Sequence, residues 1–363
     1  MRGSLADAID PGQLRRVLVI KLRHHGDVLL TSPVFTVLKN HAPQVEIDAL
    51  VYHETREMLT LHPAIDNVFT VDRGWKRRGV LQQLSEEAKL LRTLRARRYD
   101  LLIHLTEHPR GAWLRRLLGA RYSVAHMFPG RRGAWWRSSF SHLYPLPATP
   151  RHTVECHLDA VRRIGIYPGD GERALTLVPG VEADASVDAV LQAHGLKTKE
   201  FIHFHPTSRW LFKCWGEEKC AELIDRLQAS GRQVVLTAAP MVVERDYVRR
   251  ILGKVRSPVV DLSGQLSLKQ LASLTRHAKC FVGVDSAPMH IAAAMQTPVV
   301  VLFGPSGEIA WGPWQVVQRV ITSRHTCRPC GLDGCGGGKV SECLTSIQVE
   351  RVLAAVNELL TLK

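Results

Sequence analysis

The chain of 363 residues is 45% hydrophobic and 23% charged, which is ordinary for a globular protein and excludes a long disordered region. Its length exceeds that of one ordinary core and predicts two domains. The first residues lack the apolar run of a signal peptide, and the most apolar run, residues 298–303, is far too short to span a membrane. Eight cysteines without a secretory signal indicate a reducing cytoplasm and argue against a disulfide framework.

The net charge of +14 is concentrated in one region of the first half. Residues 73–163 contain 19 Lys and Arg against 6 Asp and Glu, a difference of +13, with Trp75, Trp135 and Trp136 among them. Such a surface suits nucleic acid, anionic lipid headgroups or a phosphorylated substrate, and the alternative is a merely solvated face. Tryptophan beside arginine is typical of a membrane interface, which favours a functional face.

Strands and helices alternate from the start of the chain. Residues 16–22 contain too few polar positions for a half-exposed strand and predict a buried one. The turn His24-His25-Gly26-Asp27 follows, and then a helix with an apolar face. Residues 126–151, rich in Pro, Gly, Arg and Trp, predict a loop excursion. The other elements expected in this half are strands at 46–51, 67–71 and 100–105, and helices at 80–97 and 152–164.

A second series of strands and helices follows a predicted domain boundary at residues 178–180. Its expected strands are 201–205, 233–237, 259–261, 280–284 and 298–303, and its helices are 184–194, 217–229, 243–252, 268–276 and 347–360. Two successive βαβ series predict an α/β protein with two doubly wound, Rossmann-like parallel sheets.

The expected domains are residues 1–180 and 181–345, with residues 346–363 as a C-terminal helix that packs back towards the first domain. Ligands are expected beyond the carboxyl ends of the strands, in a cleft between the domains. The chain has no G-x-G-x-x-G after its first strand, no Walker loop, no G-x-S-x-G and no H-E-x-x-H. A dehydrogenase therefore loses its main support, and the candidate site residues lie in turns that follow strands.

The first of these turns is Gly26-Asp27. A single carboxylate after the first strand could remove a proton from an attacking hydroxyl. The alternative is that Asp27 caps a helix. Because Ser32-Pro33 offers a competing cap, the sequence favours the base.

The second turn, residues 205–215, follows the strand that opens the second domain. Thr207, Ser208, Arg209 and Lys213 provide hydroxyls and two cations, which suit a diphosphate, although either cation could instead be an ordinary surface residue. Glu244, which follows the next strand, could reach a ribose hydroxyl or lie exposed on a helix.

The third turn joins the buried strand 280–284 to an alanine-rich helix. Asp285 or Ser286 suits the N-cap, and the free amides of the first helical turn, from Ala287 on, can bind an anion such as phosphate. Ser286 and His290 lie one turn apart on the same face of the helix. The alternatives are that Asp285 only caps the helix and that His290 only packs.

These turns together resemble one family over nearly the whole chain. Residues 26–33, 207–215 and 285–290, followed by 298–305, are similar to the ADP-heptose lipopolysaccharide heptosyltransferases, inverting enzymes with the GT-B fold. The loop at 207–213 and the cysteine-rich tail most resemble the heptosyltransferase III branch, which adds a side heptose to the second heptose of the inner core.

The resemblance implies a role for each turn. Asp27 matches the proposed base, Lys213 matches the residue that holds the donor diphosphate, and Asp285 and His290 match residues of the donor pocket. Glu244 aligns only loosely with the ribose-binding acid. The other expected donor contacts are Thr207, Ser208, Ser286 and Ala287, and the role of Arg209 stays open. The implied reaction is a direct displacement at the anomeric carbon that needs no cofactor, with ADP-heptose as a substrate.

The basic region then has an expected partner, the phosphorylated inner core of lipopolysaccharide (lipid A, Kdo and heptose). The candidate acceptor contacts are His108, Arg110, Arg131 and Arg132. We expect a cytoplasmic enzyme that associates peripherally with the anionic inner-membrane surface and binds no nucleic acid.

The spacing Cys327-x2-Cys330-x4-Cys335-x7-Cys343 could hold a structural zinc ion or an iron–sulfur cluster. Free thiols in a glycine-rich loop are the alternative. A single C-x-x-C with irregular spacing after it is weaker than paired knuckles, which favours free thiols. The resemblance implies that catalysis needs no metal.

Rival functions are a GT-B glycosyltransferase with another nucleotide sugar, a basic nucleic-acid-binding protein and a nucleotide-binding module without activity. The second leaves Asp27 and Asp285 unexplained, and intact Asp27 and Lys213 argue against the third.

Overall fold

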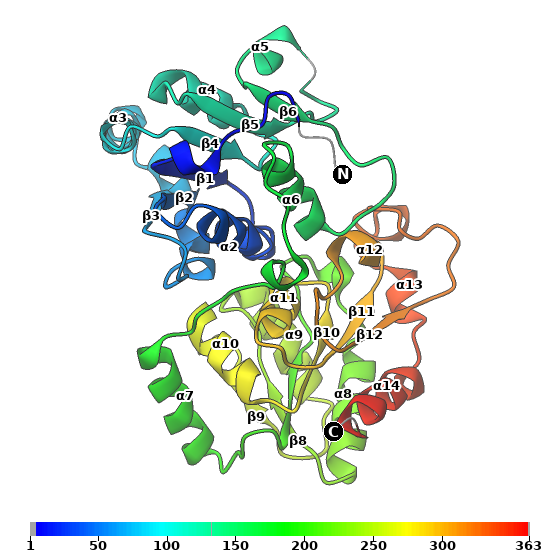
Figure 1. The fold of residues 1–363 in the computed structure, drawn as a ribbon. Coiled ribbons are helices and arrows are strands. Elements are labelled where there is room, and N and C mark those ends of the chain that lie inside the picture. Colours follow the sequence, from blue (N-terminus) through cyan, green and yellow to red (C-terminus); the bar gives the residue numbers. More distant parts are fainter. Residues whose placement is uncertain (1–4, 132, 362–363) are drawn as a thin grey trace. The chain divides into compact units, whose positions relative to one another are not determined.

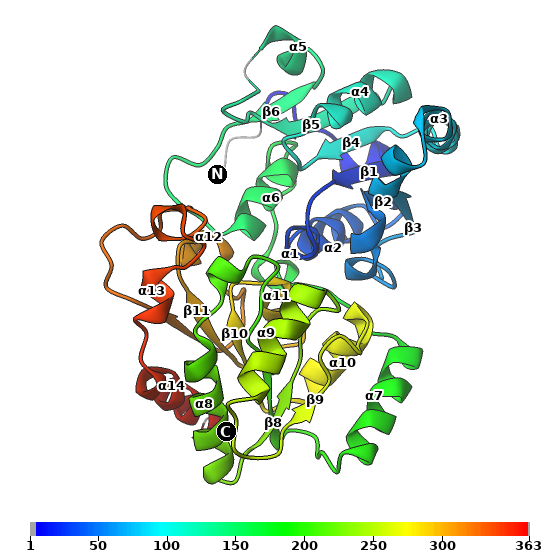
Figure 2. The same cartoon turned by 180° about the vertical axis from the view of Figure 1, so that it is seen from behind.

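The computed structural model describes residues 5–131 and 133–361, and within them the chain forms two six-stranded sheets (Figures 1 and 2). In the described residues every pair of neighbouring strands is parallel, and each sheet is flanked by helices. The chain divides into two compact units between Thr176 and Leu177. The prediction of an α/β protein with two doubly wound parallel sheets is confirmed.

The first unit contains a sheet of order β3-β2-β1-β4-β5-β6. Helices cover both faces of this sheet, so neither face contacts water. Strand β1 is therefore apolar at almost every position. The strands are β1 (Arg16–Lys21), β2 (Glu46–Tyr52), β3 (Asn67–Val71), β4 (Leu101–His104), β5 (Tyr122–His126) and β6 (His142–Tyr144).

Helices α2 and α6 pack together on one face of this sheet, and α3 packs with α4 on the other. Strands β1 and β4 are therefore neighbours whose following segments leave towards opposite faces, which makes them the switch point of the sheet. The helices are α1 (His25–Leu29), α2 (Ser32–His41), α3 (Val80–Ala96), α4 (Pro109–Leu118), α5 (Ala134–Arg137) and α6 (Thr153–Arg162), with 3-10 turns η1 (Pro11–Gln13), η2 (His53–Met58), η3 (Arg73–Arg77) and η4 (Asp170–Glu172).

The second unit repeats this plan with the order β12-β11-β10-β7-β8-β9. Its switch point lies between β7 and β10, which pair directly. The strands are β7 (Phe201–His205), β8 (Gln233–Leu236), β9 (Val260–Asp261), β10 (Cys280–Val284), β11 (Val299–Phe303) and β12 (Gln318–Thr322).

One face of the second sheet carries α8, α9 and α14, and the other carries α7, α10 and α11 (Figure 2). The helices are α7 (Val181–Ala193), α8 (Glu217–Ala229), α9 (Val242–Leu252), α10 (Leu268–His277), α11 (Ala287–Ala294), α12 (Glu308–Trp311), α13 (Glu342–Thr345) and α14 (Val349–Thr361), with 3-10 turns η5 (Leu211–Lys213) and η6 (Cys335–Gly337).

The predicted loop excursion at residues 126–151 is wrong in part. It contains α5 and the edge strand β6, which pairs with β5 through Val124 opposite His142. The sequence hid them because they are only four and three residues long, too short for a periodic pattern. Trp136 of α5 is buried and its indole N–H donates to the carbonyl of His126, so this stretch is part of the core.

Helix α14 forms part of the second unit. Its apolar side, with Val352, Val356 and Leu359, is buried in the core that α8 and the second sheet share. In residues 5–131 and 133–361, none of the helices combines the length and the apolar character that crossing a membrane requires.

Candidate functional site

Asp27 lies directly beyond the carboxyl end of β1, in the first turn of α1. The N-cap of α1 is His24, so the alternative that Asp27 is a helix N-cap is wrong. Its carboxylate lies 3.9 Å from Lys21 Nζ and 3.7 Å from Arg23 Nε, and the side chain is 14% exposed. Asp27 is therefore a partly exposed carboxylate held between two cations at the switch point of the first sheet.

Lys21, which the sequence analysis missed, is the buried partner of this carboxylate. Its ammonium donates to the carbonyl of Leu105 at 3.0 Å and lies 2.9 Å from His157 Nε2. His157 Nδ1 lies 3.0 Å from the carbonyl of Leu30, which can only accept, so Nδ1 carries the proton and Nε2 accepts from Lys21. The third N–H of Lys21 is then the one available to Asp27. A lysine in an otherwise apolar strand was the signal that could have found it.

Burial lowers the pKa of Lys21 from its ordinary 10.5 to about 8. Between these two pH values the unfolded chain binds more protons than the folded chain, so the free energy of unfolding gained from this group rises with pH. We expect the free energy of unfolding of the wild-type protein, relative to that of a Lys21→Met variant, to rise by about 1 kcal/mol from pH 7 to pH 9. Urea unfolding of both proteins at the two pH values measures this difference. A difference that stays constant or shrinks would show that Lys21 is not buried as an ammonium.

The predicted acceptor residues lie beyond β4 and β5, but they are not equivalent. His108 is the N-cap of α4 and accepts the amide of Arg110 at 3.1 Å, and burial together with Arg110 and Arg131 lowers its pKa. Arg110 makes a bidentate ion pair with Glu87, with both N···O distances at 2.6 Å. Arg131 Nε is buried without a hydrogen-bond partner among the described residues, and Arg132 lies outside them. Arg131 is thus the better candidate for an anionic ligand.

In the second unit the clearest charged pair joins the two turns of the switch point. Lys213 Nζ lies 2.6 Å from Asp285 Oδ2, and both side chains are largely buried. An ammonium has three N–H groups, so two remain for a ligand. Asp285 therefore pairs with a lysine instead of acting as the cap that the alternative proposed.

Helix α11 begins beside this pair, as the sequence predicted. Ser286 is the N-cap, but its hydroxyl donates to the carbonyl of Val284 at 3.2 Å and makes no side-chain cap. The amides at Ser286 and Ala287 are therefore left for an anion. His290 is buried in the next turn.

Thr207 and Ser208 follow β7 and are both buried. The Thr207 hydroxyl donates to Glu244 Oε2 at 2.7 Å and lies 3.3 Å from His205 Nε2. Burial lowers the pKa of His205 to about 3, so the ring is neutral. Glu244 is buried, so the alternative of an exposed helix-face glutamate is wrong, and its link to Thr207 fixes the loop that carries Lys213.

A cavity of about 520 Å³ lies beside Lys213. Its walls include Trp210, Phe212 and Trp311, and Lys213 Nζ lies 5.3 Å from the centre of the Trp210 ring. Flat aromatic walls beside a cation suit a nucleotide base next to its phosphates. Sequence reasoning did not assign these aromatic residues, although Trp210 stands inside the loop that it singled out.

Comparison with known proteins identifies the family of this chain. Residues 87–340 match glycosyltransferase family 9 (heptosyltransferase). Lipopolysaccharide heptosyltransferase 3 of Escherichia coli K12 is 35% identical over 348 residues, which cover 93% of this chain and 96% of that protein. The chain belongs to glycosyltransferase family 9.

Solved structures share the fold of this family 9 glycosyltransferase. A family 9 glycosyltransferase from Veillonella parvula has a TM-score of 0.83 at 22% identity and covers 98% of this chain and 99% of its own. Escherichia coli ADP-heptose lipopolysaccharide heptosyltransferase II has a TM-score of 0.74 at 23% identity, with 95% and 98% covered. The GT-B fold class is thus confirmed.

The cysteines of this family 9 enzyme do not form the zinc site that the sequence allowed. Cys327, Cys330 and Cys335 are exposed free thiols on the segment after β12, whereas Cys343 is buried in α13. In the part of the chain that the structure describes, no three His, Cys, Asp or Glu side chains are arranged to hold a metal ion. The arrangement of these residues therefore does not fit the structural metal that the sequence left open.

Proposed function

We propose that this family 9 glycosyltransferase transfers L-glycero-D-manno-heptose from ADP-heptose to the second heptose of the lipopolysaccharide inner core, with inversion. The observation that carries the proposal is the 35% identity to a lipopolysaccharide heptosyltransferase 3 over nearly the full length of both chains. The ADP-heptose donor is named for a second relative of the same fold, heptosyltransferase II.

The second unit would hold the donor. The two N–H groups of Lys213 that Asp285 leaves over, together with the amides at the start of α11, can bind the two phosphates. The aromatic cavity beside Lys213 can take the adenine. As the bond between the sugar and the diphosphate breaks, negative charge grows on the leaving phosphate oxygen, and these donors stabilise it.

The first unit would supply the base. Asp27 takes the proton from the acceptor hydroxyl, whose oxygen forms a bond to the anomeric carbon as the bond to ADP breaks on the opposite side. The electron pair of that bond leaves on the phosphate, so the product is an inverted glycoside. Lys21 and Arg23 attract the carboxylate and restrict its position.

We expect Arg131, more than Arg110, to bind the phosphates of the acceptor. Glu87 already occupies the guanidinium of Arg110 through two hydrogen bonds, whereas the Nε group of Arg131 is unsatisfied among the described residues. We expect Arg131→Ala to raise the acceptor KM about tenfold and Arg110→Ala to change it less, with kcat for both near wild type. Steady-state kinetics on phosphorylated and dephosphorylated acceptors measure both values. Equal effects on the two acceptors would contradict a phosphate contact.

We also propose that the enzyme is cytoplasmic and associates peripherally with an anionic membrane through side chains of α4 and α5. Trp113 of α4 and Trp135 of α5 are 55% and 39% exposed, and their rings lie 5.2 Å apart. Arg116 lies over Trp135, which combines an apolar ring with a cation, as interfacial side chains do. Cosedimentation with vesicles that contain phosphatidylglycerol tests the association, and equal sedimentation of a Trp113→Ala/Trp135→Ala variant would argue against this face.

The test of the function is incubation with ADP-heptose and lipopolysaccharide truncated after the second heptose, followed by mass analysis. The expected product carries one more heptose. Parallel reactions with UDP-glucose and a thermal-shift titration with short duplex DNA test the rival functions. Transfer from UDP-glucose alone, or stabilisation by DNA without any transfer, would overturn the proposal.

A further inference from the structure

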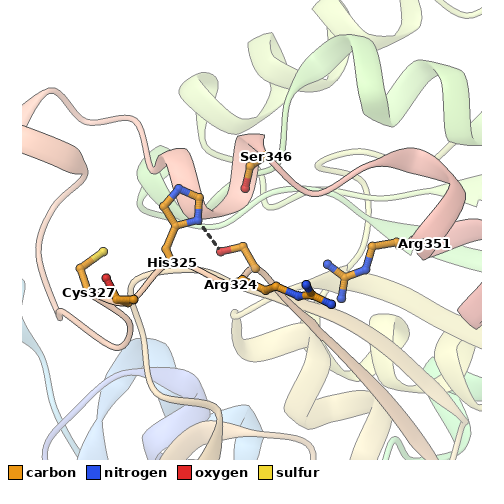
Figure 3. Close-up of a pocket in the computed structure, with 7 residues that line it drawn as sticks. Arg324, His325, Cys327, Ser346 and Arg351 are labelled. Carbon is orange, nitrogen blue, oxygen red and sulfur yellow. Dashed lines mark hydrogen bonds between the residues drawn. The ribbon is translucent and has the colours of Figure 1, made fainter.

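A second pocket of about 530 Å³ lies in the same unit but shares none of its lining residues with the cavity beside Lys213 (Figure 3). One wall is the segment Ser323–Cys327, which directly follows β12. The other wall consists of Ser346, which follows α13, and Arg351 of α14. Its volume lies in the range of roughly 300–1,000 Å³ that is usual for sites of small ligands. Neither the donor nor the acceptor assignments use these residues.

The pocket is lined by cations and hydroxyls and by no carboxylate. Arg324, His325 and Arg351 supply guanidinium and imidazole groups, and the remaining lining residues are Ser323, Thr326, Cys327 and Ser346. In Figure 3 the guanidinium groups of Arg324 and Arg351 point into the same space. An anion between them would be attracted by both groups.

Neither Arg324 nor Arg351 forms an ion pair with a described residue, whereas three other arginines of this unit do. Arg328 pairs with Glu308 at 3.1 Å, Arg226 pairs with Glu350 at 2.9 Å, and Arg319 pairs with Glu358. Arg324, in contrast, makes no hydrogen bond or ion pair within residues 5–131 and 133–361. Unlike these three arginines, Arg324 keeps its full charge for a ligand.

Arg351 is positioned by one bond and otherwise free to bind. Its Nη1 donates to the carbonyl of Thr322 at 3.0 Å, which fixes the guanidinium at the end of β12. A guanidinium carries five N–H groups, so most of them remain for a ligand. His325 Nδ1 lies 2.9 Å from Ser323 Oγ, which orients the ring (Figure 3).

We propose that this pocket binds a phosphate group, held between the guanidinium groups of Arg324 and Arg351. The planar fork of arginine matches the oxygens of a phosphate, and a fixed guanidinium loses less freedom on binding than a mobile one. The pocket is wider than a bare phosphate and leaves room for a sugar or glycerol attached to it.

The test uses the full chain with saturating ADP, so that the site beside Lys213 is filled and cannot contribute. Phosphorus NMR titration with inorganic phosphate and with mannose 6-phosphate measures binding. We expect Arg324→Ala, an exposed and uncontacted position, to weaken binding about tenfold or more, and Arg324→Ala/Arg351→Ala to abolish it. The matched control is Arg256→Ala, an exposed arginine between α9 and β9, which should bind as the wild type does.

A parallel series measures cosedimentation with phosphatidylcholine vesicles that contain phosphatidylglycerol. If the Arg324 variants lose binding of mannose 6-phosphate but still bind vesicles, the pocket binds a soluble or sugar-borne phosphate. If they lose binding of vesicles but still bind mannose 6-phosphate, the pocket binds a lipid headgroup. Binding of both probes by the double variant at the level of the wild type and of Arg256→Ala would overturn the proposal. So would a wild-type protein that binds neither probe while ADP binding is intact.

Discussion

We expect the Asp27→Ala and Asp27→Asn variants to lose sugar transfer by about 10²- to 10⁴-fold, because a general base contributes a factor of this size. ADP binding should stay at the wild-type level, since no donor contact has been assigned to the first unit. Asparagine keeps the size of the side chain and removes only its ability to take a proton, so it separates the chemistry from packing. Turnover with saturating donor and acceptor, together with calorimetric titration of ADP, measures both quantities.

The matched control for Asp27 is Asp170→Asn, because the Asp170 side chain is 97% exposed and lies in the same unit. It removes one negative charge and should leave turnover unchanged. If Asp27→Asn keeps near-normal turnover, Asp27 is not the base. If it also loses ADP binding, its defect lies in folding and the variant must be compared with wild type by thermal unfolding.

The second large effect is expected for Lys213→Met. This change removes the cation that faces the diphosphate and leaves Asp285, whose side chain is 9% exposed, without a partner. We expect kcat/KM to fall by about 10²- to 10³-fold, comparable with the loss of one donor to a developing negative charge. ADP affinity should fall as well, which distinguishes this variant from Asp27→Asn.

A double variant, Lys213→Met/Asp285→Asn, separates stability from binding. It removes both charges of the pair, so it should unfold at a higher temperature than Lys213→Met alone, whereas transfer should stay low. Lys254→Met, on the surface of the same unit, is the control for the loss of one lysine. Recovery of activity in the double variant would mean that Lys213 serves only to neutralise Asp285.

Most of the fold could be predicted from local patterns. Strands such as Cys280–Val284 and Val299–Phe303 are uninterrupted apolar runs, because each is buried on both faces of a parallel sheet. The edge strands β6 and β12 were missed, since one is three residues long and the other, with the polar Gln318, Arg319 and Thr322, lacks such a run.

The sequence predicted some parts of the candidate site and not others, because only some of them depend on residues that are neighbours in the chain. The turns after β1, β7 and β10 could be found because a strand end and a polar turn are neighbours in sequence. The pairing of Arg110 with Glu87 could not, because it joins residues 23 positions apart through the packing of α3 on α4. That pairing occupies the guanidinium of Arg110, whereas Arg131 Nε has no hydrogen-bond partner in the described part of the chain.

The sequence by itself identified the turns that hold the candidate site residues, because parallel strands align their carboxyl ends at one edge of each sheet and the residues that follow them lie along that edge. Only the tertiary structure decided which charges are neutralised and which remain available. Lys21 lies beside His157, 136 positions away, whereas Arg324 pairs with no acid among residues 5–131 and 133–361. The physical reason is that an ion pair depends on the distance between two side chains, and for residues far apart in the chain the packing of the elements sets that distance.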